Sequence, residues 1–216
     1  MVIRVFFDGL CKPRNKRGIA TYSFLIYEDN KLLAKDWGLA AEPNSDNATI
    51  HTAEYVGMLK ALEWLVEHNI TSEHVQIYGD NVGVIKQLKG ELGVSSKRLK
   101  PLYRRTQKLL TNFKSYDFVW IPKYANEEAA ELSRRAYVEY IIKRNKELAE
   151  NISPLKINPI RPGIYIVEGY QVNLTQLTCT CKFYKNINRM FKGNIKIPCK
   201  HIYAAQFFEE KRKKAK

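Results

Sequence analysis

Long apolar runs are absent from this sequence. No stretch approaches the roughly 20 apolar residues that a membrane-spanning helix needs. Arg4 and Asp8 interrupt the apolar run at the N-terminus before it reaches the length of a signal peptide. We therefore expect a soluble, cytoplasmic or nucleoid-associated protein with no membrane partner.

Acidic residues are in short supply. The chain has 22 Asp and Glu against 36 Lys and Arg, which gives a formal net charge of +14 and a pI near 9.6. The excess is concentrated in residues 155–216, where 13 basic residues accompany 3 acidic ones. A basic surface attracts phosphates and gains affinity from released counterions. The balance favours a nucleic-acid partner, although a run of charges is often only a solvated face.

Cysteine is scarce as well, at 4 residues in 216. Three of the four lie in Cys179-Thr-Cys181 and Cys199-Lys-His201, on either side of a basic stretch. Three thiols and an imidazole favour tetrahedral zinc over magnesium. A disulfide with a spare His is the alternative, which a reducing cytosol disfavours. We expect the fourth cysteine, Cys11, to be an incidental residue in a turn.

Three apolar elements each carry a carboxylate. Residues 2–9 and 75–80 read as strands that end at Asp8 and Asp80, and residues 49–68 read as a helix with Glu54 in its first turn. Taken singly, an Asp at a strand end often starts a turn, and an acid at a helix start complements the helix dipole. Three such acids together indicate a shared site.

The order of elements predicts an α/β unit. Residues 18–29 and 32–41 complete an antiparallel meander with the first strand, and the helix 49–68 crosses over to a parallel strand. A fifth strand at 118–121 follows, and the last helix begins at Asn126. We therefore expect a mixed five-stranded sheet with helices on its faces, within a domain of residues 1–148.

With these motifs in this order, the first 140 residues resemble the ribonuclease H family, type 1-like. The matching pieces are Phe-Phe-Asp-Gly at 6–9, Thr-Ala-Glu-Tyr at 52–55, Tyr-Gly-Asp-Asn at 78–81 and Asn-x-x-Ala-x-x-Leu-Ser at 126–133. The resemblance implies that Asp8, Glu54 and Asp80 meet at one edge of the sheet. It also implies cleavage of the RNA strand of an RNA/DNA hybrid into 5′-phosphate and 3′-hydroxyl ends, with DNA or double-stranded RNA as further possible partners.

Clustered carboxylates require a cation, because they repel one another and otherwise take up protons. Mg²⁺ and Mn²⁺ prefer oxygen ligands and suit such a cluster. In a two-ion site, one ion activates the attacking water and the other stabilises the departing oxygen.

One position departs from the family. Ala130 stands where the family's last helix carries its fourth acid, an Asp. One explanation is that Glu127 replaces this acid as a metal ligand, because it lies three residues earlier on nearly the same helix face and has a longer side chain. A second explanation is that Glu131 replaces it, but this residue is less well placed because it points about 100° around the helix. An engineered change that traps an inactive enzyme is a third explanation.

Four residues are candidates for substrate contact. His51 occupies a position where relatives often have an Asn that contacts the RNA backbone, and a polar group there could read 2′-hydroxyls. Lys123 lies in the loop where many bacterial relatives carry a His. Gly9 and Asn81 directly follow Asp8 and Asp80.

The C-terminal part changes character. Prolines at 154, 159 and 162 indicate a linker at 149–162, and residues 163–174 read as a hairpin about Gly169. With Pro-Cys-Lys-His-x-x-Ala at 198–204, residues 163–210 resemble a SWIM zinc finger, followed by a basic tail at 211–216. The resemblance implies a structural zinc held by Cys179, Cys181, Cys199 and His201, and binding to DNA or proteins.

The basic stretch of this module alternates with aromatic residues, which could stack on bases or form a small core. Its members are Lys182, Phe183, Tyr184, Lys185, Arg189, Phe191, Lys192, Lys196 and Lys200. The preferred hypothesis is a metal-dependent ribonuclease H whose zinc module raises affinity for the hybrid. The alternatives are a noncatalytic hybrid- or DNA-binding protein and a zinc module that recruits a protein partner.

Overall fold

The computed structural model describes residues 2–13, 17–191 and 196–214. The chain forms two compact units, Met1–Tyr137 and Val138–Lys216, here termed the N-terminal and C-terminal units. The boundary between them falls within helix α4 (Glu127–Glu150). Among the described residues, no helix combines the length and the apolar character needed to cross a membrane.

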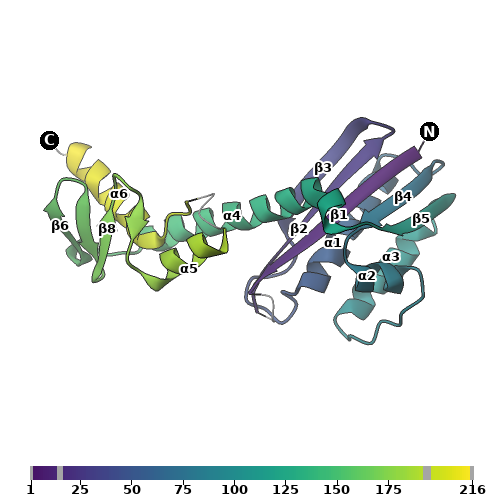
Figure 1. The fold of residues 1–216 in the computed structure, drawn as a ribbon, viewed down its shortest axis with the longest axis horizontal. Coiled ribbons are helices and arrows are strands. Elements are labelled where there is room, and N and C mark those ends of the chain that lie inside the picture. Colours follow the sequence, from purple (N-terminus) through teal and green to yellow (C-terminus); the bar gives the residue numbers. More distant parts are fainter. Residues whose placement is uncertain (1, 14–16, 192–195, 215–216) are drawn as a thin grey trace. The chain divides into compact units, whose positions relative to one another are not determined.

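The N-terminal unit is built on a five-stranded mixed sheet (Figure 1). Its strands are β1 (Val2–Lys12), β2 (Ile19–Glu28), β3 (Lys31–Leu39), β4 (His74–Gly79) and β5 (Ser115–Trp120). Their order in the sheet is β3-β2-β1-β4-β5, with β1 antiparallel to β2 and parallel to β4. This arrangement confirms the expected sheet.

Helix α1 (Ile50–Glu67) packs on the face of the sheet to which β1 turns Ile3, Val5 and Phe7, all completely buried. Thr49 caps this helix by accepting a hydrogen bond from the Thr52 amide at 3.2 Å. No acid lies in the first turn, so the prediction that Glu54 falls there is wrong, and the helix dipole does not explain this residue. The remaining helices of this unit are α2 (Val82–Leu88), α3 (Leu99–Leu110) and the 3-10 turn η1 (Lys123–Asn126).

Gly9 lets β1 and α1 meet without an intervening side chain. A Cβ atom at position 9 would lie 2.4 Å from the Glu54 backbone nitrogen and 2.8 Å from the Ala53 carbonyl carbon. Such contacts with backbone atoms leave room only for glycine. The close approach sets Glu54 directly against β1 beside Asp8, which lies within this strand and not at its end as the sequence predicted.

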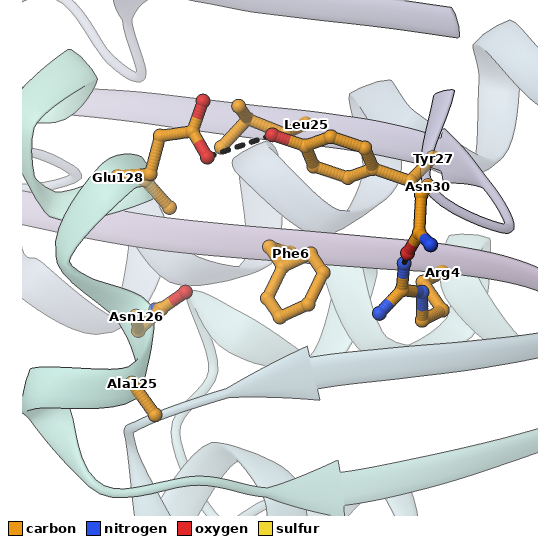
Figure 2. Close-up of a pocket in the computed structure, with 9 residues that line it drawn as sticks. Arg4, Phe6, Leu25, Tyr27, Asn30, Ala125, Asn126 and Glu128 are labelled. Atoms are coloured by element: carbon orange, nitrogen blue, oxygen red, sulfur yellow. Dashed lines mark hydrogen bonds between the residues drawn. The ribbon is translucent and has the colours of Figure 1, made fainter. Parts of the chain in front are cut away.

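The start of α4 is fastened to β2 by three side-chain hydroxyls. Thr21 donates to the Ser133 carbonyl at 2.9 Å, and Ser23 donates to the Ala129 carbonyl at 2.6 Å. Tyr27 donates to Glu128 Oε2 at 2.7 Å (Figure 2). The Thr21 and Ser23 hydroxyls are buried, and buried hydroxyls that find such partners fix the elements they join. The position of residue 130 on the sheet is therefore set by these bonds.

Cys11 lies in β1 and not in a turn, contrary to expectation. Its side chain is 1% exposed, and its thiol donates to the Ala48 carbonyl at 3.3 Å. It belongs to a small apolar cluster with Ala20, Ala48 and Ala53. A free cysteine in such a place acts as a small apolar residue.

The C-terminal unit contains a four-stranded sheet in the order β6-β7-β8-β9. Its elements are the 3-10 turn η2 (Pro154–Lys156), β6 (Ile157–Arg161), β7 (Ile164–Val167), β8 (Tyr170–Asn173), β9 (Thr178–Cys179), α5 (Lys182–Met190) and α6 (Lys200–Lys214). The β7–β8 hairpin turns at Gly169, where φ is 83°. This turn confirms the hairpin expected there.

The range 149–162, expected to be a linker, contains the end of α4 and the whole of β6. Pro159 lies within β6 and pairs with Tyr165. Proline is tolerated there because β6 is an edge strand, which leaves one row of backbone groups unpaired. The expected basic tail is helical as far as Lys214, in α6, and its last two residues lie outside the described ranges.

Candidate active site and zinc-binding cluster

Asp8, Glu54 and Asp80 form a carboxylate cluster in the N-terminal unit. Each offers an oxygen, and these oxygens all lie within 4.8 Å of one another. Asp8 and Asp80 meet because β1 and β4 are parallel neighbours, paired as far as Phe6 and Tyr78, two residues before each acid. Glu54 joins them from α1 through the close approach at Gly9.

Burial raises the pKa of all three carboxyls. Desolvation, only partly offset by the hydrogen bond from Ser133, raises the pKa of Asp8 from 3.8 to about 6. Desolvation and the neighbouring Asp8 and Asp80 charges raise the pKa of Glu54 well above its usual value. Burial also raises the pKa of Asp80, against the opposing effect of Lys123. The cluster therefore favours either protons or a bound cation.

The oxygens of this cluster suit a hard divalent cation. Glu54 is 2% exposed, and its Oε2 finds no hydrogen-bond partner among the described residues. Glu54 Oε1 accepts from the Asn81 amide at 3.5 Å, and Asp8 Oδ2 accepts from the Ser133 hydroxyl. A buried carboxylate oxygen without a donor is costly unless a cation lies beside it. The donor set fits Mg²⁺ or Mn²⁺.

Cys179, Cys181, Cys199 and His201 form a second cluster, in the C-terminal unit. Their ligand atoms also lie within 4.8 Å of one another, and all four side chains are buried. The three cysteines are free and not joined in a disulfide, so the disulfide alternative is wrong. The geometry and the soft donor set fit tetrahedral zinc.

Backbone amides support the sulfur atoms. The Tyr184 amide donates to Cys181 Sγ at 3.3 Å, at the N-terminus of α5, and the Cys181 amide donates to Cys179 Sγ at 3.4 Å. Hydrogen bonds with Cys179 and Cys199 lower the pKa of Cys181, whereas the neighbouring thiols raise that of Cys199. Burial lowers the pKa of His201, but hydrogen bonds with Cys179 and Cys181 outweigh it and raise the value to about 9.

Two known families match this chain, one in each unit. The reverse transcriptase-like family matches residues 6–136. This chain belongs to that family. The SWIM zinc finger matches residues 170–205. The chain thus contains a ribonuclease H-like domain followed by a SWIM zinc finger, as the sequence motifs predicted.

Individual relatives share the fold of the ribonuclease H-like domain. Ribonuclease HI of Halobacterium salinarum is 28% identical over 136 residues, which make up 62% of this chain and 63% of that protein. The crystal structure of ribonuclease H1 from the same organism superposes with a TM-score of 0.57 at 24% identity, covering 64% of this chain and 99% of that one. LC11-RNase H1, solved in complex with an RNA/DNA hybrid, has a TM-score of 0.56 at 22% identity, with 62% and 95% covered.

Ala130, which the sequence motif predicts to stand in place of a fourth acid, is 3% exposed at the start of α4. Neither of the nearby glutamates belongs to the carboxylate cluster in the described part of the chain. Glu127 instead pairs with Arg134, with 2.5 Å between Oε1 and Nη2, and Glu131 is exposed. For Glu127 to replace the missing acid, its side chain must first leave Arg134.

The structure gives the substrate-contact candidates different surroundings. Asn81 caps α2, accepting from the Val84 amide at 3.3 Å while its own amide donates to Glu54. His51 is exposed on α1. Lys123 is exposed in η1, and its positive charge lowers the pKa of Asp8, Glu54 and Asp80. Asn81 therefore has a structural role, whereas His51 and Lys123 are open to a ligand.

A cavity of about 240 Å³ is lined by residues of β1, β2, η1 and the start of α4 (Figure 2). Phe6 lines it from β1, on the same strand face as Asp8, and Asn126 and Glu128 border it from η1 and α4. None of the three clustered acids lines this cavity. Asn126, 1% exposed, donates its amide to the Phe7 carbonyl at 2.9 Å. It thereby ties η1 to β1 just before Asp8, a role that its sequence motif did not reveal.

Glu168 orients the histidine of the SWIM zinc finger. His201 turns Nδ1 toward Cys179 and Cys199, at 3.7 and 3.8 Å from their sulfur atoms. Its Nε2 lies 3.3 Å from Glu168 Oε2, which also pairs with Lys200 at 2.6 Å. A carboxylate on the outer nitrogen fixes the tautomer and the ring orientation of a metal-binding histidine.

We expect Glu168→Gln to weaken zinc binding by about 10- to 100-fold, the usual effect of losing such an outer carboxylate. Competition with a chromophoric chelator measures the affinity. Glu209→Gln is the matched control, because Glu209 pairs only with the exposed Lys213 among the ion pairs described, at 3.5 Å on α6. Equal affinities of the two variants would contradict the role of Glu168.

Proposed function

We propose that this chain is a metal-dependent endonuclease that hydrolyses the RNA strand of RNA/DNA hybrids, leaving 5′-phosphate and 3′-hydroxyl ends. The observation that carries the proposal is the buried carboxylate cluster, in which one oxygen of Glu54 has no hydrogen-bond partner among the residues that the structure describes. The ribonuclease HI relative and the hybrid bound to LC11-RNase H1 support this choice of substrate.

The residues around the cluster have distinct roles. Asp8, Glu54 and Asp80 hold the divalent cation, which when bound lowers the pKa of water and stabilises negative charge on oxygen. Ser133 and Asn81 each donate to one oxygen of Asp8 and Glu54 and so fix the rotation of the two carboxylates. Exposed Lys123 contacts a backbone phosphate. His51, one turn before Glu54 on α1, reaches the 2′-hydroxyls of the RNA strand.

We further propose that the SWIM zinc finger binds zinc as a closed structural site and contributes a second surface for nucleic acid. Helix α5 buries only Ile187 and carries Lys182, Lys185 and Arg189. Phe183 and Tyr184 pack against the core of the unit, so positive charge rather than stacking supplies the attraction. Lys192 lies outside the described residues. A tethered second contact raises the effective concentration of the hybrid at the active site.

The alternative function is noncatalytic binding of a hybrid or of DNA. Ala130 favours it, because the site has three acids where the resembled family has four. In that case the cluster would still bind its cation and nucleic acid but would not cleave the RNA strand. Recruitment of a protein partner through the zinc finger is a third function.

Cleavage of an end-labelled RNA strand in a hybrid, with Mn²⁺ present, tests the proposal. The chain is compared with Ala130→Asp and Asp8→Asn. We expect the chain and Ala130→Asp to cut and Asp8→Asn to lose all detectable cleavage, since it removes a ligand of the cation. If only Ala130→Asp cuts, the unchanged chain is a binding protein, and a fourth acid is enough to restore activity to its site. If neither cuts while both bind the hybrid, the noncatalytic alternative is correct.

A further inference from the structure

Glu127, Ala130 and Arg134 share one face of α4, at helical spacings of three and four residues. The Arg134 guanidinium reaches Glu127, although two turns of helix separate them. Side chains on a helix lean toward its N-terminus. The arginine therefore extends back over the turn that contains Ala130, and the small methyl group at position 130 leaves room for it.

Arg134 directly follows a residue that contacts the carboxylate cluster. Ser133, its neighbour in sequence, donates its hydroxyl to Asp8 Oδ2. The positive charges of Lys123 and Arg134 both lower the pKa of Asp8, against the larger effect of burial. A positive charge is thus carried by the same face of α4 as Ala130, one residue after the hydroxyl that contacts Asp8.

Arg134 is also open to a ligand. Its side chain is 36% exposed, and that of its partner Glu127 is 60% exposed. A salt bridge this exposed contributes little stability. An incoming phosphate can therefore take the guanidinium from Glu127, and the planar fork of arginine matches phosphate oxygens in pairs.

We propose that Arg134, held over Ala130 by Glu127, binds the scissile phosphate and replaces a second divalent ion, so that the three carboxylates operate with one ion. Once the phosphate has taken the guanidinium from Glu127, the three carboxylates of the cluster offset one divalent ion and one guanidinium. In the resembled family, four acids would likewise offset two divalent ions. Here the loss of an acid and the presence of Arg134 compensate each other. That the bound phosphate is the scissile phosphate of an RNA strand rests on the proposed function.

The number of bound ions tests this inference directly. Mn²⁺ is titrated into the zinc-loaded full chain bound to a 2′-O-methyl RNA/DNA duplex, with free Mn²⁺ followed by electron paramagnetic resonance. The Asp8→Asn/Asp80→Asn variant gives the background. We expect one Mn²⁺ above background for the unchanged chain. We expect two for Ala130→Asp/Arg134→Ala, because this variant removes the arginine and restores a fourth acid. Two ions in the unchanged chain, or one in the exchanged variant, would overturn the inference.

Hybrid binding in Ca²⁺ gives a second readout. Arg134→Ala should weaken it by roughly tenfold, the scale of one charge-assisted phosphate contact. Arg135→Ala is the matched control, because it removes the same charge from the next residue, which is exposed and lies over the Trp37 ring at 4.6 Å. Equal losses in the two variants would mean that Arg134 contributes only net charge, contrary to the inference.

Neither readout depends on turnover, so the two proposals fail separately. A chain that cuts the hybrid while holding two ions would refute the role of Arg134 and leave the nuclease function standing. A chain that holds one ion and needs Arg134 for binding, but never cuts, would refute the nuclease function alone.

Discussion

Removal of zinc is expected to unfold residues 138–216 while the ribonuclease H-like domain stays folded. The core of the C-terminal unit includes Cys179, Cys181 and Cys199 together with apolar residues of β6 to β8 and α6. Without the ion, three sulfurs and an imidazole are left buried and forced to share protons. Structural zinc sites contribute on the order of 10 kcal/mol or more to folding, which exceeds the stability of most small modules. The main core of the N-terminal unit shares no residue with this one.

Tryptophan fluorescence and protease resistance separate the two units in one experiment. The three tryptophans of the chain, at 37, 64 and 120, all lie in the N-terminal unit. Zinc chelation or Cys199→Ser should therefore leave the fluorescence unchanged while residues 138–216 become open to trypsin. Cys11→Ala is the matched control, since Cys11 lies in β1 apart from the cluster. Retained protease resistance in Cys199→Ser would contradict a structural role for zinc.

The parts of the fold that were predictable are those governed by local pattern. The first strand was predicted over residues 2–9 and starts as expected at Val2, but it does not end at Asp8 and continues to Lys12. Gly169 turns the β7–β8 hairpin with a positive φ, as expected. The zinc ligands were predicted from their residue types and spacing, and the meeting of Asp8, Glu54 and Asp80 was predicted from the resemblance to the ribonuclease H family. The linker was predicted wrongly because Pro159 reads as a breaker until its strand is known to be an edge strand.

The supporting contacts were not predictable, because they join residues far apart in sequence. Glu168 and His201 meet only after the second sheet forms, and Thr21 and Ser133 lie 112 residues apart. One feature of the sequence did point to the hydroxyl bonds between β2 and α4. Thr21 and Ser23 stand at alternate positions of β2, which would be unusual if that face of the strand packed only on apolar groups. The pairing of Glu127 with Arg134 was missed because standard helix pairs span three or four residues and this one spans seven.

The raised pKa of Asp8 predicts an unusual effect on stability. In the zinc-loaded chain free of Mg²⁺ and Mn²⁺, the folded state holds the proton of Asp8 more tightly than the unfolded state does. Stability is therefore lost as the pH rises from about 4 through about 6, where only the unfolded state releases this proton readily. The rise in pKa from 3.8 to about 6 corresponds to about 3 kcal/mol at neutral pH.

Asp8→Asn, which cannot ionise, should accordingly stabilise the metal-free chain by about 2 to 3 kcal/mol at pH 7.5 and have little effect near pH 4. Urea unfolding followed by tryptophan fluorescence measures the N-terminal unit alone. Saturating Mn²⁺ should reverse the order, because only the unchanged chain keeps all three ligands. Asp46→Asn is the control, since Asp46 forms an exposed ion pair with Arg17. If Asp8→Asn is instead less stable than the unchanged chain at every pH, Asp8 is held ionised without a cation. The carboxylate cluster would then not require a bound metal ion.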